Sequence, residues 1–202
     1  MRSTLVGAVL VAAAAAGCSA PADDPAPPSP DASEPSAQPP AEPLAWGEAA
    51  EVTGANGTPV ELAPVAVRYV DSGEITSPTD SDYPAQGMFA AVRIEASAAE
   101  AAETLSWPVD GGGWGWRQDG QQYSTGDGNA VTAPWVGSVP EFTSDAQFLP
   151  GEDPTVGYET FDLAEPGGHL AYTDSAGVLV RWEAPTDSTG DVPEVQELLD
   201  AQ

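Results

Sequence analysis

Residues 87–96 read GMFAAVRIEA, and this stretch decides the fold class. Met88, Ala90, Val92 and Ile94 alternate along it with a second set of side chains that includes Arg93. Alternation with a period of two is typical of a β-strand that turns one face to a core, whereas an amphipathic helix repeats every 3.6 residues. We therefore expect an extended strand over these residues.

The same period of two recurs along the chain in both directions. It is found in residues 60–69, 156–163, 170–172 and 178–183. Turn sequences separate these stretches, and the sharpest of them is the Asp-Gly pair at residues 119–120, which predicts a tight hairpin because glycine accepts a positive φ. Residues 98–105 are rich in Ala and Glu and predict no more than one helical turn. Short strands without long helices predict an all-β, antiparallel sandwich.

The order of five motifs carries a resemblance to a known family. They are residues 46–48 (WGE), 87–95 (GMFAAVRIE), 116–123 (WRQDGQQY), 149–152 (LPGE) and 157–163 (GYETFDL). In this order they resemble the telokin-like, immunoglobulin-type domain of exported bacterial lipoproteins and secreted immunogenic proteins. The resemblance covers most of residues 46–183. It implies an immunoglobulin-like β-sandwich, and it brings no catalytic residue to this chain.

The N-terminus has the composition of an export signal. Arg2 is followed by an apolar run over residues 5–16, which is shorter than the roughly 20 residues of a membrane span. The run ends in Ala15-Ala16-Gly17-Cys18, which resembles the lipobox of bacterial lipoproteins, with Ala15 where that family more often has leucine. The resemblance implies that residues 1–17 are removed and that Cys18 is acylated. The alternative is an ordinary signal peptide with a coincidental cysteine.

Three further segments follow the signal. Residues 18–43 combine the cysteine with a linker rich in proline, alanine and acidic residues, whose composition predicts disorder. Residues 44–184 contain every aromatic residue of the chain and are long enough for one domain. Residues 185–202 form an acidic tail that we expect to be either frayed or a short helix, since Pro193 suits a first helical turn.

The charge balance excludes several functions. The chain carries 32 acidic residues and 5 basic ones, for a net charge of −27, and all five basic residues are arginines. Such a chain repels nucleic acid, which requires a basic footprint. The single cysteine excludes an intrachain disulfide, and the single histidine, His169, excludes catalysis by several histidines. We therefore expect no enzymatic activity and no cofactor.

Acidic turns raise the alternative of a calcium site. The candidates are Asp80 with Asp82, and Asp127 with Asn129. Carboxylate and amide oxygens suit a hard cation, although neither pair fits the twelve-residue EF-hand loop. Asp and Asn also occur in turns because their side chains bond the local backbone, and this simpler interpretation remains beside the first.

Tryptophans are the remaining candidates for ligand binding. Trp114 and Trp116 lie beside a glycine-rich segment, and Trp135 lies in a second turn-rich stretch. Exposed tryptophans stack on sugar rings or anchor a protein partner. The alternative is that they are core residues, which the period of two favours for Trp116.

Together these features predict an exported protein at the outer face of the cytoplasmic membrane, anchored through acylated Cys18. The leading functional hypothesis is a non-catalytic binding module whose partner is an envelope protein. One alternative is a module that binds cell-wall glycan through Trp114 and Trp135. A second alternative is a lipoprotein that captures a metal ion or a small ligand.

Overall fold

The computed structural model describes residues 42–76, 82–105, 113–142 and 146–201, and these belong to one compact unit. The strands in these ranges are β1 (Ala50–Thr53), β2 (Pro59–Asp71), β3 (Met88–Ala98), β4 (Gly113–Gln118), β5 (Gln121–Ser124), β6 (Thr155–Leu163), β7 (His169–Thr173) and β8 (Leu179–Glu183). The helices are η2 (Ala130–Thr132) and α1 (Pro193–Asp200). In this part of the chain, no helix has both the length and the apolar character that a membrane span requires.

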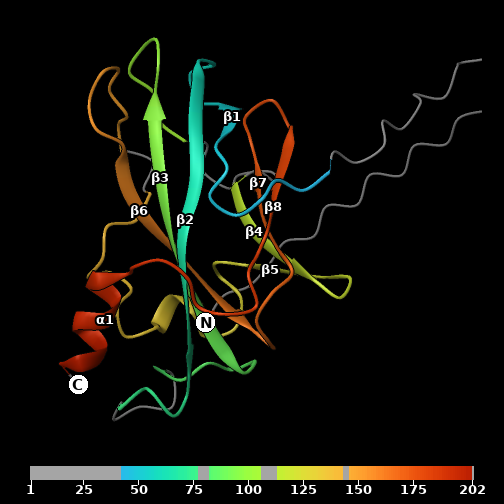
Figure 1. Ribbon diagram of the computed structural model, residues 1–202, viewed down its shortest axis with the longest axis vertical. Helices are drawn as coiled ribbons and strands as arrows, with labels where there is room; N and C mark the ends of the chain where they lie inside the picture. The colour runs from blue at the N-terminus through green and yellow to red at the C-terminus, as the bar shows by residue number, and fades with distance from the viewer. Residues whose placement is uncertain (1–41, 77–81, 106–112, 143–145, 202) are drawn as a thin grey trace, which may run out of the picture. The chain divides into compact units, whose positions relative to one another are not determined.

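The strands form two antiparallel sheets of four, as Figure 1 shows. The first sheet has the order β1-β2-β3-β6, and the second has the order β5-β4-β7-β8. In the second sheet two hairpins, β4–β5 and β7–β8, meet through their inner strands, as strands C′, C, F and G do in immunoglobulin domains. The predicted all-β, immunoglobulin-like antiparallel sandwich is confirmed.

Proline and glycine set the local geometry at two places. Pairing between β2 and β3 shifts between Pro64 and Ala66, where Val65 is the extra residue of a β-bulge. Proline has no N–H to donate to a neighbouring strand, so a bulge accommodates it in a long strand. At the other place, Asp119 and Gly120 both adopt a positive φ and close the β4–β5 hairpin that the sequence predicts.

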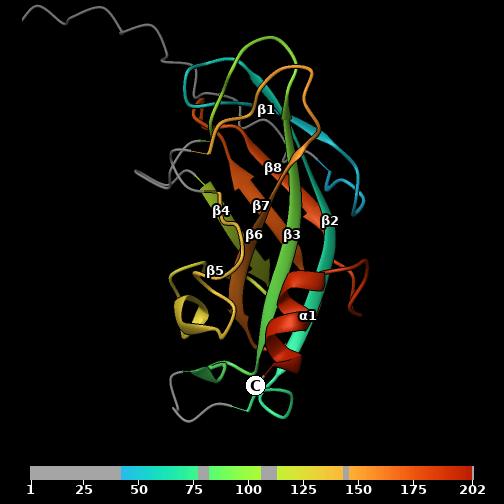
Figure 2. The ribbon, with the colours of Figure 1, turned by 90° about the vertical axis from the view of Figure 1, so that its left-hand side faces the viewer.

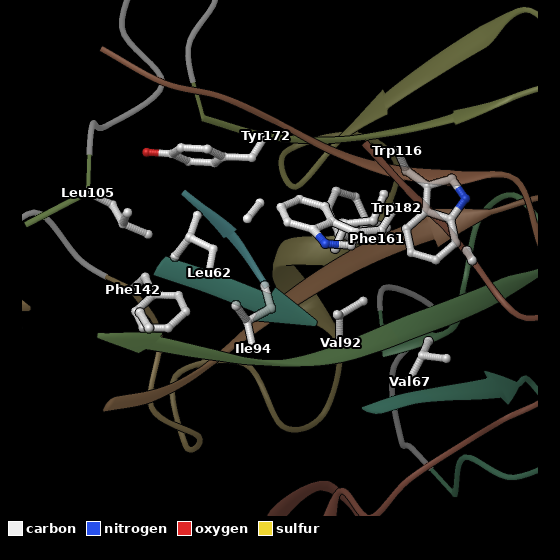
Figure 3. Packing of buried hydrophobic residues seen from close by; sticks show 14 of the residues in the cluster. Leu62, Val67, Val92, Ile94, Leu105, Trp116, Phe142, Phe161, Tyr172 and Trp182 are labelled. Carbon is white, nitrogen blue, oxygen red and sulfur yellow. The ribbon is translucent and has the colours of Figure 1, made fainter. Parts of the chain in front are cut away.

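The core between the sheets is aromatic and aliphatic. Trp116, Tyr172 and Trp182 of the second sheet face Val92 and Phe161 of the first, and each of these side chains is buried (Figure 3). Burial of apolar surface contributes about 25 cal/mol per Å² and is the main term that holds the two sheets together. The alternating residues of β3 therefore supply one face of this core, as expected.

The first sheet also buries its outer face. Val70 of β2 and Phe89 of β3 lie there, under Val195 of α1, Val192 just before it and Trp135. Figure 2 shows α1 in front of β2 and β3. The frayed alternative for residues 185–202 is not what the structure shows, because the apolar face of α1 covers an apolar sheet face.

The segment before α1 also belongs to the domain. The backbone of Thr189 exchanges two hydrogen bonds with Val67, both of 2.9 Å, along the part of β2 that β1 leaves unpaired. No side-chain hydrogen bond caps the start of α1. Instead Glu194 accepts a hydrogen bond from the hydroxyl of Tyr158 on β6.

The helical turn expected over residues 98–105 does not form. Ala98 ends β3, and Glu103 makes an isolated bridge with Phe148. The Glu103 carboxylate accepts bonds from the backbone of Asn56 and Thr58, both at 2.9 Å, and from both of their side chains. These distant donors hold the segment extended and override its local helical propensity.

Candidate functional site

A cavity of about 250 Å³ opens between the two sheets, beside β6 at the edge of the first sheet. Trp114 of β4 and Glu159 of β6 line it from the two sheets. Phe142, Ala130 of η2 and Glu141 line it from the connecting segments. Its volume lies just below the 300–1,000 Å³ that is roughly typical of ligand pockets, so it suits a small molecule.

Glycines leave room around this cavity. Gly113 lines it directly, and Gly157 of β6 lies against the ring of Phe142. A Cβ at Gly157 would lie 2.8 Å from a ring carbon of Phe142, so any larger residue there would displace that wall. Phe142 is held from its other side by an edge-to-face contact with Phe148 at 5.7 Å. The cavity is therefore bounded by fixed aromatic packing.

Trp114 is the half-buried aromatic wall of the cavity. Its ring packs against Tyr172 at 4.7 Å and Trp182 at 6.1 Å between ring centroids. Its buried indole N–H has no hydrogen-bond partner among the described residues. Trp114 is thus both a core residue and a cavity residue. This position is intermediate between the exposed ligand-binding tryptophan and the core residue that the sequence left as alternatives.

Glu159 is one of the two acidic residues that line the cavity, and it points to the inner side of the first sheet. Strand alternation places it on the same face as Phe161, and it pairs in register with Val92, which is also a core residue. In the described part of the chain its carboxyl group has no hydrogen-bond or ion-pair partner. Burial, and then the charge of Glu141, raise its pKa to about 8.

The cavity has no basic side chain to neutralise this carboxyl group. The chain contains no lysine, and none of the arginines in the described ranges lines the cavity. Arg68 is paired with Glu74, and Arg93 is paired with Glu95 at 3.1 Å. A largely apolar cavity that contains carboxyl groups, and no basic side chain among its described lining residues, is the chemical character of this site.

The other two predicted tryptophans have no surface to offer a ligand. Trp116 is 0% exposed, and its indole donates to the carbonyl of Gly167 at 2.9 Å. Trp135 is also 0% exposed, and its indole donates to the hydroxyl of Thr160 at 3.0 Å. Both are core residues, because each buries its ring and satisfies its N–H internally.

The predicted acidic turn at residues 127–129 holds the backbone together. Asp127 accepts from the N–H of Ser124 at 2.6 Å, and the side-chain amide of Asn129 donates to the carbonyl of Tyr83 at 2.8 Å. The backbone N–H of Asn129 donates to buried Asp162 at 2.8 Å. These contacts match the interpretation of Asp127 and Asn129 as turn residues, and the calcium interpretation stays a prediction.

The second predicted pair is only partly described. Asp80 lies outside the described residues, and Asp82 is half-buried at the start of the segment that leads to β3. Across the ranges that the structure describes, no group of three or more His, Cys, Asp or Glu residues is arranged to hold a metal ion. Cys18 also lies outside these ranges.

The described lining of the cavity contains carboxyl and hydroxyl groups but no histidine or cysteine. His169 begins β7 and lies in the wall of a separate, shallow depression with Arg117. The single histidine of the chain is therefore placed apart from the cavity.

Of these two residues that line the cavity, the sequence analysis named Trp114 and did not name Glu159. The signal was present, because Gly157, Glu159 and Phe161 share one face of an alternating strand, and a charged residue on the inward face is unusual. The contribution of Glu141 was not visible, since it comes from a connecting segment whose path the alternation does not define.

Comparison with known proteins adds a likeness in structure. No family model and no curated protein sequence matches the chain. A crystal structure of a secreted protein from Mycobacterium tuberculosis, MPT63, is similar with a TM-score of 0.43 and 19% sequence identity. The match covers 71% of this chain and 98% of that one. A likeness at this level carries no information about ligand or activity.

Proposed function

We propose that this chain is an exported, lipid-anchored, non-catalytic module that binds a small ligand in the cavity between its sheets. The observation that carries the proposal is the cavity itself, in which Trp114 and the unpaired carboxyl group of Glu159 lie within mainly apolar walls. Concave apolar sites with few polar groups are the usual form of small-molecule sites.

This choice ranks small-ligand capture above the two other hypotheses from the sequence. A glycan platform built on Trp114 and Trp135 loses support, because Trp135 is fully buried. A protein partner has no apolar patch to recognise among the described residues, where the exposed large apolar side chains are Val131, Leu149 and Val178 on three separate segments. Isolated exposed apolar residues of this kind do not indicate an interface.

The cavity is tested with two matched substitutions. Val131 lines the cavity and is 58% exposed, whereas Val178 is 55% exposed in the turn between β7 and β8. Val131→Trp narrows the cavity without disturbing the core, and Val178→Trp adds the same bulk elsewhere. We expect small aromatic and aliphatic probes to bind the chain by ligand-observed NMR, and to lose binding only in Val131→Trp. The proposal is contradicted if both variants bind the probes equally. It is also contradicted if neither the variants nor the parent chain bind them.

Export and anchoring are supported by the sequence of residues 1–18. Two acyl chains on one cysteine give stable membrane attachment, whereas one chain gives marginal attachment. We expect the chain to incorporate labelled palmitate in a bacterial host and to sediment with membranes, and Cys18→Ala to abolish both. Membrane association that survives Cys18→Ala removes the anchor from the proposal and leaves the cavity untouched.

A further inference from the structure

The unpaired carboxyl group of Glu159 defines which ligand the cavity suits. A carboxylate in an apolar setting is unfavourable unless a proton or a positive charge neutralises it. Neither comes from the protein in the described part of the chain, because no arginine lines the cavity and no donor bonds the carboxyl group. With no such group among the described residues, a proton from solvent or a cation carried by a ligand can neutralise the carboxylate.

The walls of the cavity distinguish between classes of cation. A calcium ion takes about six to eight oxygen ligands. The described lining contributes the carboxyl groups of Glu159 and Glu141, and one oxygen of Glu141 already accepts from the N–H of Gly137 at 3.1 Å. The remaining surface is mainly apolar and aromatic, and aromatic rings attract weakly hydrated organic cations. Trp114 lines the same cavity.

We propose that the cavity binds a small organic monocation, an ammonium or guanidinium group on a short apolar body, with Glu159 as its counter-ion and Trp114 as an aromatic wall. This inference rests on the proposed function and names its ligand class. The volume of about 250 Å³ limits the body of the ligand to roughly a single ring or a short branched chain.

Binding of such a cation displaces a proton. With a pKa of about 8, the Glu159 carboxyl group is mainly protonated at neutral pH in the empty cavity. The cation binds the carboxylate, and the proton leaves to solvent. Affinity should therefore rise with pH, by up to about tenfold per unit below the pKa.

The surrounding charges are mostly paired with one another. Glu141 is the charged group that faces Glu159. On β3, Arg93 and Glu95 form an ion pair. On the outer face of β6, the hydroxyl of Tyr158 donates to Glu194 of α1. Of the two carboxyl groups that line the cavity, Glu159 is thus the one that accepts no hydrogen bond from the described residues.

The test uses matched pairs of cations and neutral alcohols on the full chain. Benzylammonium, phenethylammonium and isoamylammonium are each compared with the alcohol of the same shape, by isothermal titration calorimetry from about pH 6 to about pH 8 in two buffers of different ionisation enthalpy. Glu159→Gln removes the charge and keeps the volume. Glu61→Gln removes an equal charge from an exposed position on β2, outside the cavity.

We expect at least one ammonium ion to bind about tenfold or more tightly than its alcohol, with proton release at neutral pH. Glu159→Gln should abolish this preference for the ammonium ion over its alcohol, and Glu61→Gln should have no effect. Unchanged circular dichroism confirms that each variant is folded.

Three results overturn the inference, and they separate it from the proposed function. Alcohols that bind as tightly as ammonium ions leave a binding cavity but refute the cation preference. Calcium binding that Glu159→Gln abolishes, with no response to ammonium ions, replaces the organic cation with a metal. If neither the ammonium ions nor the alcohols bind, the inference is refuted. If the small aromatic and aliphatic probes used with Val131→Trp also fail to bind, the proposed function is refuted as well.

Discussion

Glu103 is a buried glutamate and Glu159 a half-buried one, and their surroundings differ in one decisive respect. Glu103 is 1% exposed and accepts hydrogen bonds from Asn56, Thr58 and the backbone of Thr104. Burial opposes its ionisation, but these bonds outweigh burial and lower its pKa to about 2. Glu159 has no such donors, so burial raises its pKa to about 8.

The difference separates a structural carboxylate from a candidate binding group. Asp174 resembles Glu103 in this respect. It accepts hydrogen bonds from the N–H groups of Thr53, Ala176 and Val178, and these bonds outweigh burial and lower its pKa. Such groups are already satisfied by loops and have nothing left for a ligand. A carboxyl group that the fold buries without hydrogen-bond donors contributes nothing to stability. Such a residue is expected where function, rather than stability, determines the residue type.

The largest change in the free energy of unfolding should come from removing a carboxylate that the protein supplies with hydrogen-bond donors. Glu103→Ala leaves the backbone donors of Asn56, Thr58 and Thr104 without their acceptor. We expect a loss of about 3–5 kcal/mol in the free energy of unfolding, measured by urea denaturation. Glu61→Ala, at an exposed position, should change it by less than about 0.5 kcal/mol. Similar losses in the two variants would break the comparison.

A smaller change in the free energy of unfolding should appear at acidic pH. A carboxyl group whose pKa is lower in the folded state stabilises the protein above its unfolded pKa, and this contribution disappears as pH falls through the folded value. Lowering the pH from about 4.5 to about 2 should therefore remove about 2–3 kcal/mol through Glu103 alone. Urea midpoints measured across this range should fall steeply in the parent chain and more gently in Glu103→Gln. Parallel profiles would show that Glu103 is not the group that titrates.

The smallest predicted change in stability has the opposite dependence on pH. The folded-state pKa of Glu159 is raised, so folding favours its protonated form and stability should fall as pH rises from about 4.5 to about 8. Glu159→Gln should remove this loss and stabilise the chain by about 1 kcal/mol near pH 9, an amount reduced because the side chain is partly exposed. Near pH 4 the two chains should unfold alike. Destabilisation by Glu159→Gln at alkaline pH would mean that the carboxylate has a partner after all.

The sequence predicted the elements whose signal is local. Alternation identified β2, β3, β6, β7 and β8, and the Asp-Gly pair identified the β4–β5 hairpin. These signals succeed because a half-buried strand and a tight turn each impose residue types within a few positions.

Features that depend on distant partners were missed. Residues 98–105 carry helical propensity, but Glu103 bonds donors more than 40 positions earlier in the chain, at Asn56 and Thr58. Trp135 is in a turn-rich stretch, yet it packs edge-to-face on Phe89 at 5.7 Å, within the outer layer that α1 completes. The cavity belongs to the same class, since it exists only where residues of both sheets and the connecting segments converge.

The layer that α1 adds to the first sheet has a consequence for how damage to the domain is detected. Val192 and Val195 pack over Val70 and Phe89, so a local opening of α1 uncovers an apolar sheet face without separating the two sheets. Such a face is of the kind that chaperones bind and proteases detect. A chain truncated before Val192 would display this face permanently. The state of α1 therefore distinguishes an intact domain from a damaged one.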